Sequence, residues 1–87
     1  MITAEIAGTL FAVRGRPCML DQMYTYTVNG IEHTVAIVDV GNHWQAVNHA
    51  WHGRWFDTTQ YSSKAALVRA LTEGTAVWLP TTVEMGD

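Results

Sequence analysis

Histidine is the residue type in this chain best suited to bind a metal, and three of its four histidines fall within residues 43–55. The three are His43, His49 and His52, and imidazole nitrogens are common zinc ligands. His49 and His52 are three residues apart, which puts them on one face of a helix but on opposite faces of a strand. The only cysteine, Cys18, is distant in sequence, so no thiolate ligand lies near them. We therefore expect no structural zinc, and keep His43, His49 and His52 as the candidate metal or ligand set of an alternative hypothesis.

Cys18 is a second candidate for chemistry, because a thiolate assisted by a histidine and an aspartate can act as a nucleophile. Asp39 or Asp57 can supply the aspartate. The neighbours Pro17 and Met19 are apolar, however, and an unpaired cysteine in such surroundings is typically buried. Reactivity needs an accessible, electropositive site. We therefore expect Cys18 to be a core residue and the protein to be no enzyme.

Tryptophan is concentrated in the same segment as the histidines, with an arginine beside it. A domain of 87 residues has little interior in which to hold so many large rings. Tryptophan and arginine are also the residues that most often dominate the energy of protein–protein interfaces. The sequence therefore predicts a partner-binding surface formed by Trp44, Trp51, Arg54 and Trp55. The alternative, that these rings only cover a thin core, stays open.

An Asn-Gly pair at residues 29 and 30 gives the clearest structural signal, because both central positions of a type I′ turn need a positive φ. A two-residue turn fixes the register of its flanking strands, here residues 23–28 and 31–38. Tyr26 then lies opposite His33, on a face that is apolar and aromatic, while the other face is mostly threonine and glutamate. The pattern predicts an antiparallel hairpin.

The segment that carries the candidate residues, residues 43–52, is compatible with two structures. Trp44, Val47 and Trp51 lie at helical spacing, whereas the chain on either side has the pattern of strands. We favour a strand, and the helical alternative stays open at this point.

One helix is predicted over about residues 63–73. Ser62 or Ser63 can cap its first turn, and Gly74 can take the left-handed conformation that commonly ends a helix. Leu67 and Leu71 lie on the apolar side of this helix, which predicts that this side packs on the sheet.

The elements together predict an α+β fold in a single domain, residues 1–87. We expect a small two-layer structure, with a mostly antiparallel sheet of four to five strands in a meander and the helix packed on one face. The last strand, residues 76–79, is expected to stop at Pro80, which has no N–H to donate. Residues 81–87 are then expected to fray as a tail.

The composition limits the kinds of partner. The net charge is −3, from 8 acidic and 5 basic residues, and nucleic-acid binding needs a basic surface. A sheet that stacks bases on its aromatic rings is therefore the least favoured alternative. No apolar run approaches the roughly 20 residues of a membrane span. A single cysteine excludes an internal disulfide, which suits a reducing compartment, so we expect a cytoplasmic protein.

In size, mild acidity and lack of a catalytic motif, the chain resembles the small proteins that phages and mobile elements carry. That resemblance concerns general character, and it implies an inhibitor that binds and blocks a host protein. The sequence thus predicts a non-catalytic protein–protein interaction module that needs no cofactor, and a homodimer stays open. The alternative is a small metal- or ligand-binding protein that uses the three histidines of residues 43–52.

Overall fold

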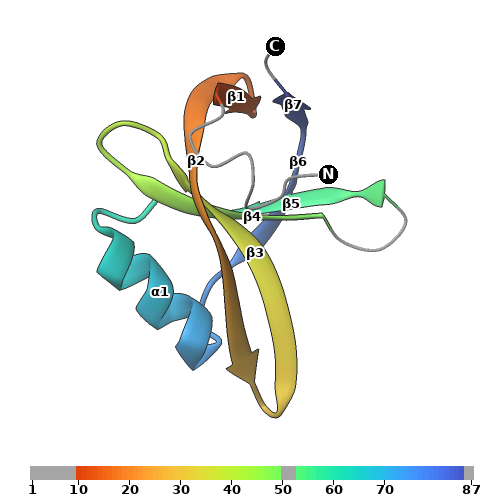
Figure 1. The fold of residues 1–87 in the computed structure, drawn as a ribbon, viewed down its shortest axis with the longest axis vertical. Helices are drawn as coiled ribbons and strands as arrows, with labels where there is room; N and C mark the ends of the chain where they lie inside the picture. The colour runs from red at the N-terminus through yellow and green to blue at the C-terminus, as the bar shows by residue number, and fades with distance from the viewer. Residues whose placement is uncertain (1–9, 50–52, 86–87) are drawn as a thin grey trace.

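A computed structural model of the protein describes residues 10–49 and 53–85 (Figure 1). These residues form seven strands and one helix in a single sheet-based unit. The bounds are β1 Leu10–Val13, β2 Arg16–Val28, β3 Ile31–Asp39, β4 Trp44–His49, β5 Trp55–Thr58, α1 Lys64–Glu73, β6 Trp78–Thr81 and β7 Val83–Met85. All strands belong to one sheet in the spatial order β6-β5-β4-β3-β2-β1-β7, and every neighbouring pair is antiparallel.

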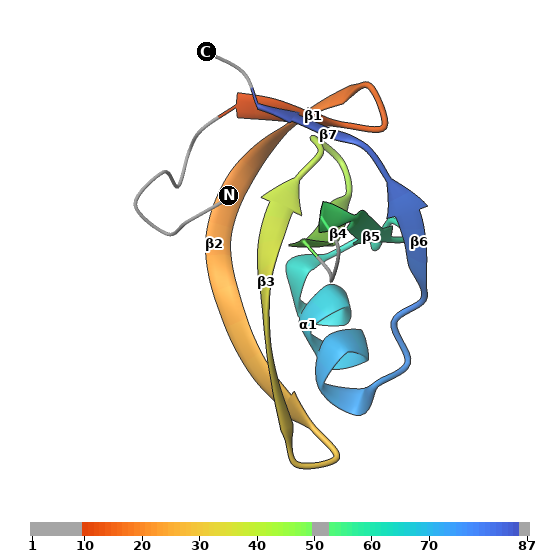
Figure 2. The same ribbon diagram turned by 90° about the vertical axis from the view of Figure 1, so that its right-hand side faces the viewer.

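The sheet curves until it nearly closes on itself. β6 and β7 lie at opposite edges of the sheet, although only Thr82 separates them in the chain. The backbone N–H of Arg14, in the turn between β1 and β2, donates to the carbonyl oxygen of Thr82 at 3.1 Å. Figure 2 shows β1 and β7 crossing one end of the molecule, above the strands that they complete. The result is a barrel-like sheet.

The expected two-layer fold, with four to five strands and a helix on one face, is therefore wrong. β2 runs for 13 residues: residues 16–19 pair with β1, and residues 19–28 pair with β3, with a change of register between Leu20 and Gln22. Pro80 does not end the last strand but lies within β6, opposite Phe56, because an edge strand tolerates a residue without an N–H. The segment expected as a tail contains β7, which pairs with β1.

The predicted hairpin has the expected register. Tyr26 lies opposite His33, and Asn29 and Gly30 have φ angles of 52° and 78°. Both values lie in the left-handed region that a type I′ turn requires. The Asn-Gly signal is confirmed.

The predicted helix and the strand within residues 43–52 are also present. In α1, the hydroxyl oxygen of Ser63 accepts a hydrogen bond from the N–H of Ala66 at 3.1 Å, and Gly74 ends the helix with φ 74°. Residues 44–49 form β4, which confirms the strand alternative for them. Residues 50–52 lie outside the described residues.

Two clusters of buried side chains lie on opposite faces of the sheet, because adjacent residues of β3 and β4 belong to different clusters. In Figure 2, β4 and β5 lie between α1 on one side and the crossing of β1 and β7 on the other. The inner cluster, on the side of that crossing, contains Val13, Cys18, Leu20, Ala36, Val38 and Val47. The helix-side cluster contains Tyr26, Val35, Ile37, Ala46, Leu67 and Leu71.

Candidate functional site

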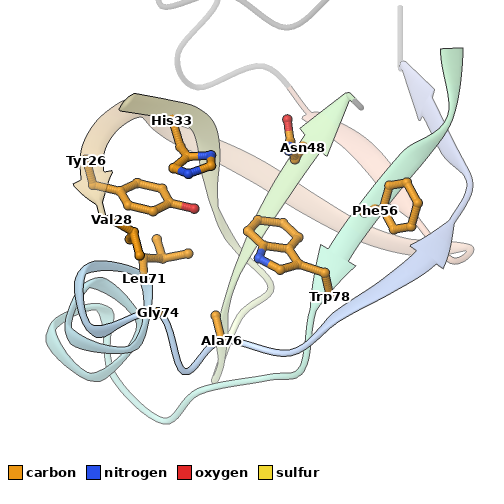
Figure 3. Close-up of a pocket in the computed structure, with 9 residues that line it drawn as sticks. All are labelled: Tyr26, Val28, His33, Asn48, Phe56, Leu71, Gly74, Ala76 and Trp78. Atoms are coloured by element: carbon orange, nitrogen blue, oxygen red, sulfur yellow. The ribbon is translucent and has the colours of Figure 1, made fainter. Parts of the chain in front are cut away.

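A hollow of about 360 Å³ opens on the helix side of the sheet, next to the C-terminal end of α1 (Figure 3). We call it the aromatic hollow, because four of its lining residues carry rings that come from four different strands. The rings belong to Tyr26 of β2, His33 of β3, Phe56 of β5 and Trp78 of β6. The other lining residues are Val28, Asn48, Leu71, Gly74 and Ala76.

Strand pairing explains why these side chains share one side of the sheet. Tyr26 and His33 are directly paired in the hairpin, so both project to the same face. Asn48 of β4 is paired with Phe56 of β5 in the same way. Trp78 is paired with Thr58, two residues beyond Phe56, and therefore also lies on that face.

The end of the helix forms one wall of the aromatic hollow. Gly74 ends α1 near the turn of the hairpin. A Cβ atom built on Gly74 would lie 3.2 Å from Cγ1 of Val28. A side chain at this position would therefore need both a positive φ and a small movement of the Val28 side chain. The helix end and the hairpin are thus fixed close together, which holds this wall in place.

The walls of the aromatic hollow are apolar apart from a few hydrogen-bonding groups. Its nine lining residues include no carboxylate, ammonium or guanidinium group. The ring of Tyr26 stacks on that of His33, with centroids 5.3 Å apart, and Figure 3 shows its hydroxyl directed into the hollow. Burial raises the pKa of Tyr26, so the hydroxyl stays protonated at neutral pH. With the amide of Asn48, this hydroxyl can orient an uncharged occupant by hydrogen bonding.

The structure does not place Trp44 and Trp55 of the predicted partner surface side by side. Trp44 begins β4, is half-buried against the helix-side cluster, and has the ammonium nitrogen of Lys64 at 5.9 Å from its ring centroid. Trp55 is paired with His49 at the other end of β4 and packs against the inner cluster. The two rings thus belong to opposite faces and opposite ends of the strand. Contact between a partner and these residues stays a prediction.

The other residues of the predicted partner surface are placed as follows. Arg54 is exposed and directly precedes β5, beside Trp55. Trp51 lies outside the described residues. The described part of the predicted surface therefore consists of one exposed arginine and two half-buried rings, of which only that of Trp55 is next to the arginine in the chain.

The histidines proposed as an alternative metal set are also separated. His43 directly precedes β4 and His49 ends it, so about 20 Å of extended chain lies between them. Both are exposed, and the ring centroid of His49 lies 4.5 Å from that of Trp55. His52 lies outside the described residues. Within residues 10–49 and 53–85, no group of three or more His, Cys, Asp or Glu side chains is arranged to hold a metal ion.

The sequence predicts part of this lining, but not a hollow. Tyr26 and His33 are predicted on the apolar face of the hairpin, and Leu71 on the apolar side of the helix. Tyr26 and His33 both carry polar atoms on this otherwise apolar face of the hairpin. Such atoms indicate a face that is partly open to solvent. Asn48 and Phe56 carried no signal of their own, because only the pairing of β4 with β5, and of β5 with β6, brings them to the hollow.

Comparison with known proteins adds no assignment: no family model, curated protein or solved structure matches this chain. In the described ranges, no helix has the length and apolar character needed to cross a membrane.

Cys18 is expected to resist thiol reagents in the folded protein. Its side chain is 3% exposed in the inner cluster, and burial raises its pKa to about 11. At pH 8 only about one molecule in a thousand would carry the reactive thiolate even if the reagent could reach it. Reaction with a chromogenic disulfide reagent should be complete within minutes in denaturant and very slow without it. Rapid reaction of the native protein would show that Cys18 is accessible and would contradict its place in the core.

Proposed function

We propose that this protein is a non-catalytic binding module that holds an uncharged, apolar or aromatic group of a protein partner in the aromatic hollow. One observation carries the proposal: rings from four strands surround a single hollow, and its described lining residues include no carboxylate, ammonium or guanidinium group. Aromatic walls bury a large area of an apolar guest, and offset or edge contacts with a second ring add to the attraction.

A side chain that projects from a larger partner suits the shape of the aromatic hollow. The hollow is open to solvent on one side, whereas sites for small molecules usually enclose most of the ligand surface. An open, aromatic hollow resembles the pockets that receive anchor residues at protein–protein interfaces. The hydroxyl of Tyr26, whose pKa is raised by burial, supports binding because it is a hydrogen-bond donor at neutral pH and not a base.

Titration with N-acetyltryptophanamide, a neutral model of a tryptophan in a peptide, tests the proposal. At about −0.3 kcal/mol for each of its roughly 18 non-hydrogen atoms, the expected dissociation constant is about 0.1 mM. In two-dimensional NMR spectra, the amide signals of Asn48, Gly74 and Ala76 and the indole N–H of Trp78 should shift together and saturate. The N-acetyl amide of glutamate, which carries a charge, should produce no saturable shift.

A matched pair of variants decides whether the aromatic hollow is the site. Asn48→Asp puts a carboxylate on the wall, where an apolar guest would remove it from water, so the affinity should fall at least 10-fold. Asn42→Asp makes the same chemical change at an exposed turn position and should leave the affinity unchanged. Equal affinities of the two variants, or shifts that do not map to the hollow, would disprove this site.

A further inference from the structure

A buried carboxylate in the barrel holds an arginine in a fixed orientation. Asp57 of β5 is fully buried, and its Oδ1 accepts hydrogen bonds from Nε and Nη2 of Arg14 at 3.0 and 2.8 Å. Nη2 also donates to the carbonyl oxygen of Pro80 at 3.0 Å. The guanidinium is therefore clamped between β5 and β6, and its Nη1 donates no hydrogen bond to another described side chain or carbonyl.

The side chain of Gln45 completes this network and leaves one oxygen free. Gln45 is only 6% exposed, and its Nε2 donates to Oδ2 of Asp57 at 2.9 Å and to the carbonyl oxygen of Thr58 at 2.7 Å. Its Oε1 accepts no hydrogen bond from a described residue. Gln45 lines the neighbouring pocket, and none of the described residues has a buried side-chain nitrogen or oxygen without a partner, so we infer that this oxygen faces that pocket.

The opening next to this network is a pocket of about 330 Å³, distinct from the aromatic hollow. Arg14, Gln45 and Thr58 line it together with the exposed Arg16 and Thr59. The charges of Arg14 and Asp57 cancel, so that Arg16, which forms no ion pair within the described part, gives the pocket a net positive charge. Two of the five basic residues of a chain with net charge −3 thus line one pocket.

The groups around the pocket differ in what they can bind. The free guanidinium N–H groups of Arg14 and Arg16 donate to an anion, and a fixed guanidinium is well suited to a carboxylate. The free oxygen of Gln45 instead needs a donor. A ligand that satisfies both carries a carboxylate and an N–H group close together.

We propose that this pocket binds an α-acylamino carboxylate, which is the chemistry both of an N-acylated amino acid and of the last residue of a peptide chain. The carboxylate lies against Arg14 and Arg16, and the neighbouring amide N–H donates to Oε1 of Gln45. The site does not depend on the aromatic hollow, so either proposal can fail without the other.

N-acetylalanine is the probe, and NMR shifts of the amides of Gln45, Thr59 and Gln60 report on its binding. We expect saturation in the millimolar range. N-acetylalaninamide, which lacks the carboxylate, should not bind, and acetate, which lacks the N–H, should bind at least 10-fold more weakly. Acetate that binds as tightly as N-acetylalanine would overturn the proposal, because the pocket would then attract any anion.

Arg16→Met tests the site without disturbing the clamp, because Arg16 is exposed and makes no side-chain hydrogen bond to a described residue. We expect at least a fivefold loss of affinity for N-acetylalanine. Arg69→Met, which removes an exposed arginine from α1, should change nothing. Equal affinity of the two variants would overturn the proposal.

A short peptide that ends in alanine with a free carboxylate distinguishes the two sources of this chemistry. Binding at least as tight as that of N-acetylalanine supports the end of a protein chain as the ligand. Binding of N-acetylalanine alone supports a small acylated amino acid. Failure of both to bind would overturn the proposal.

Discussion

Replacement of Arg14 by methionine is expected to lower the free energy of unfolding by about 2–3 kcal/mol, less than for a pair buried on both sides, because the Arg14 side chain is 44% exposed. The loss arises because Asp57 is fully buried and would be left in the barrel without the guanidinium that pairs with it. Gln45 would remain as a hydrogen-bond donor to the carboxylate, but a neutral amide does not replace a cation. Denaturation by urea, followed by circular dichroism, measures the change.

Two further variants isolate the ion pair. Arg16→Met makes the same substitution two residues away, at an exposed position, and should change the stability by no more than about 0.5 kcal/mol. The double variant Arg14→Met with Asp57→Leu should recover much of the loss, because an apolar pair of similar volume often replaces a buried ion pair without cost. If Arg14→Met is as stable as Arg16→Met, the ion pair between Arg14 and Asp57 does not stabilise the barrel.

Trp44→Ala and Trp55→Ala are each expected to lower the free energy of unfolding by roughly 2–3 kcal/mol, somewhat less than the loss for a fully buried ring. Trp44 packs against the helix-side cluster and Trp55 against the inner cluster, so each truncation leaves a gap beside a different core. The same denaturation experiment measures both. Ile31→Ala is the control, because Ile31 is 61% exposed at the hairpin turn and should change stability by no more than about 0.5 kcal/mol.

The tryptophan variants also bear on the partner surface predicted from the sequence. A tryptophan whose removal leaves stability unchanged would contribute to no core, and it would then be the first residue to test for contact with a partner. If both variants lose stability as expected, both tryptophan rings serve mainly to pack the core. The aromatic hollow would then be the stronger candidate for the binding surface.

Local signals predicted the hairpin and the helix because each depends on residues that are close in sequence. The turn at Asn29 and Gly30 needs only two positive φ angles, and the face pattern of the strands agrees with the register that this turn imposes. Likewise, Ser63 and Gly74 satisfy backbone groups at the two ends of α1 by contacts within one or two turns.

The closure of the sheet depends on contacts that no local pattern reveals. The register change after Leu20 bends β2, and nothing in the residue types there distinguishes a bent strand from a break. Pro80 is a strong signal against a strand, but only in the interior of a sheet, and its place at an edge could not be known beforehand. The aromatic hollow was missed because its rings come from β2, β3, β5 and β6, and the sequence pattern does not show that these strands place their rings around one hollow.

The closure through Thr82 also affects how the protein reaches this fold during synthesis. β7 pairs with β1, and β6 pairs with β5. Neither pairing can therefore form until residues 78–85 have been synthesised. A ribosome-bound chain that lacks this segment exposes the outer edges of β1 and β5, and such edges readily pair with other chains. Contacts between such distant residues also slow folding, into the range of milliseconds to seconds for sheet-rich domains. The growing chain is therefore most exposed to aggregation, and most in need of a chaperone, just before residues 78–85 emerge.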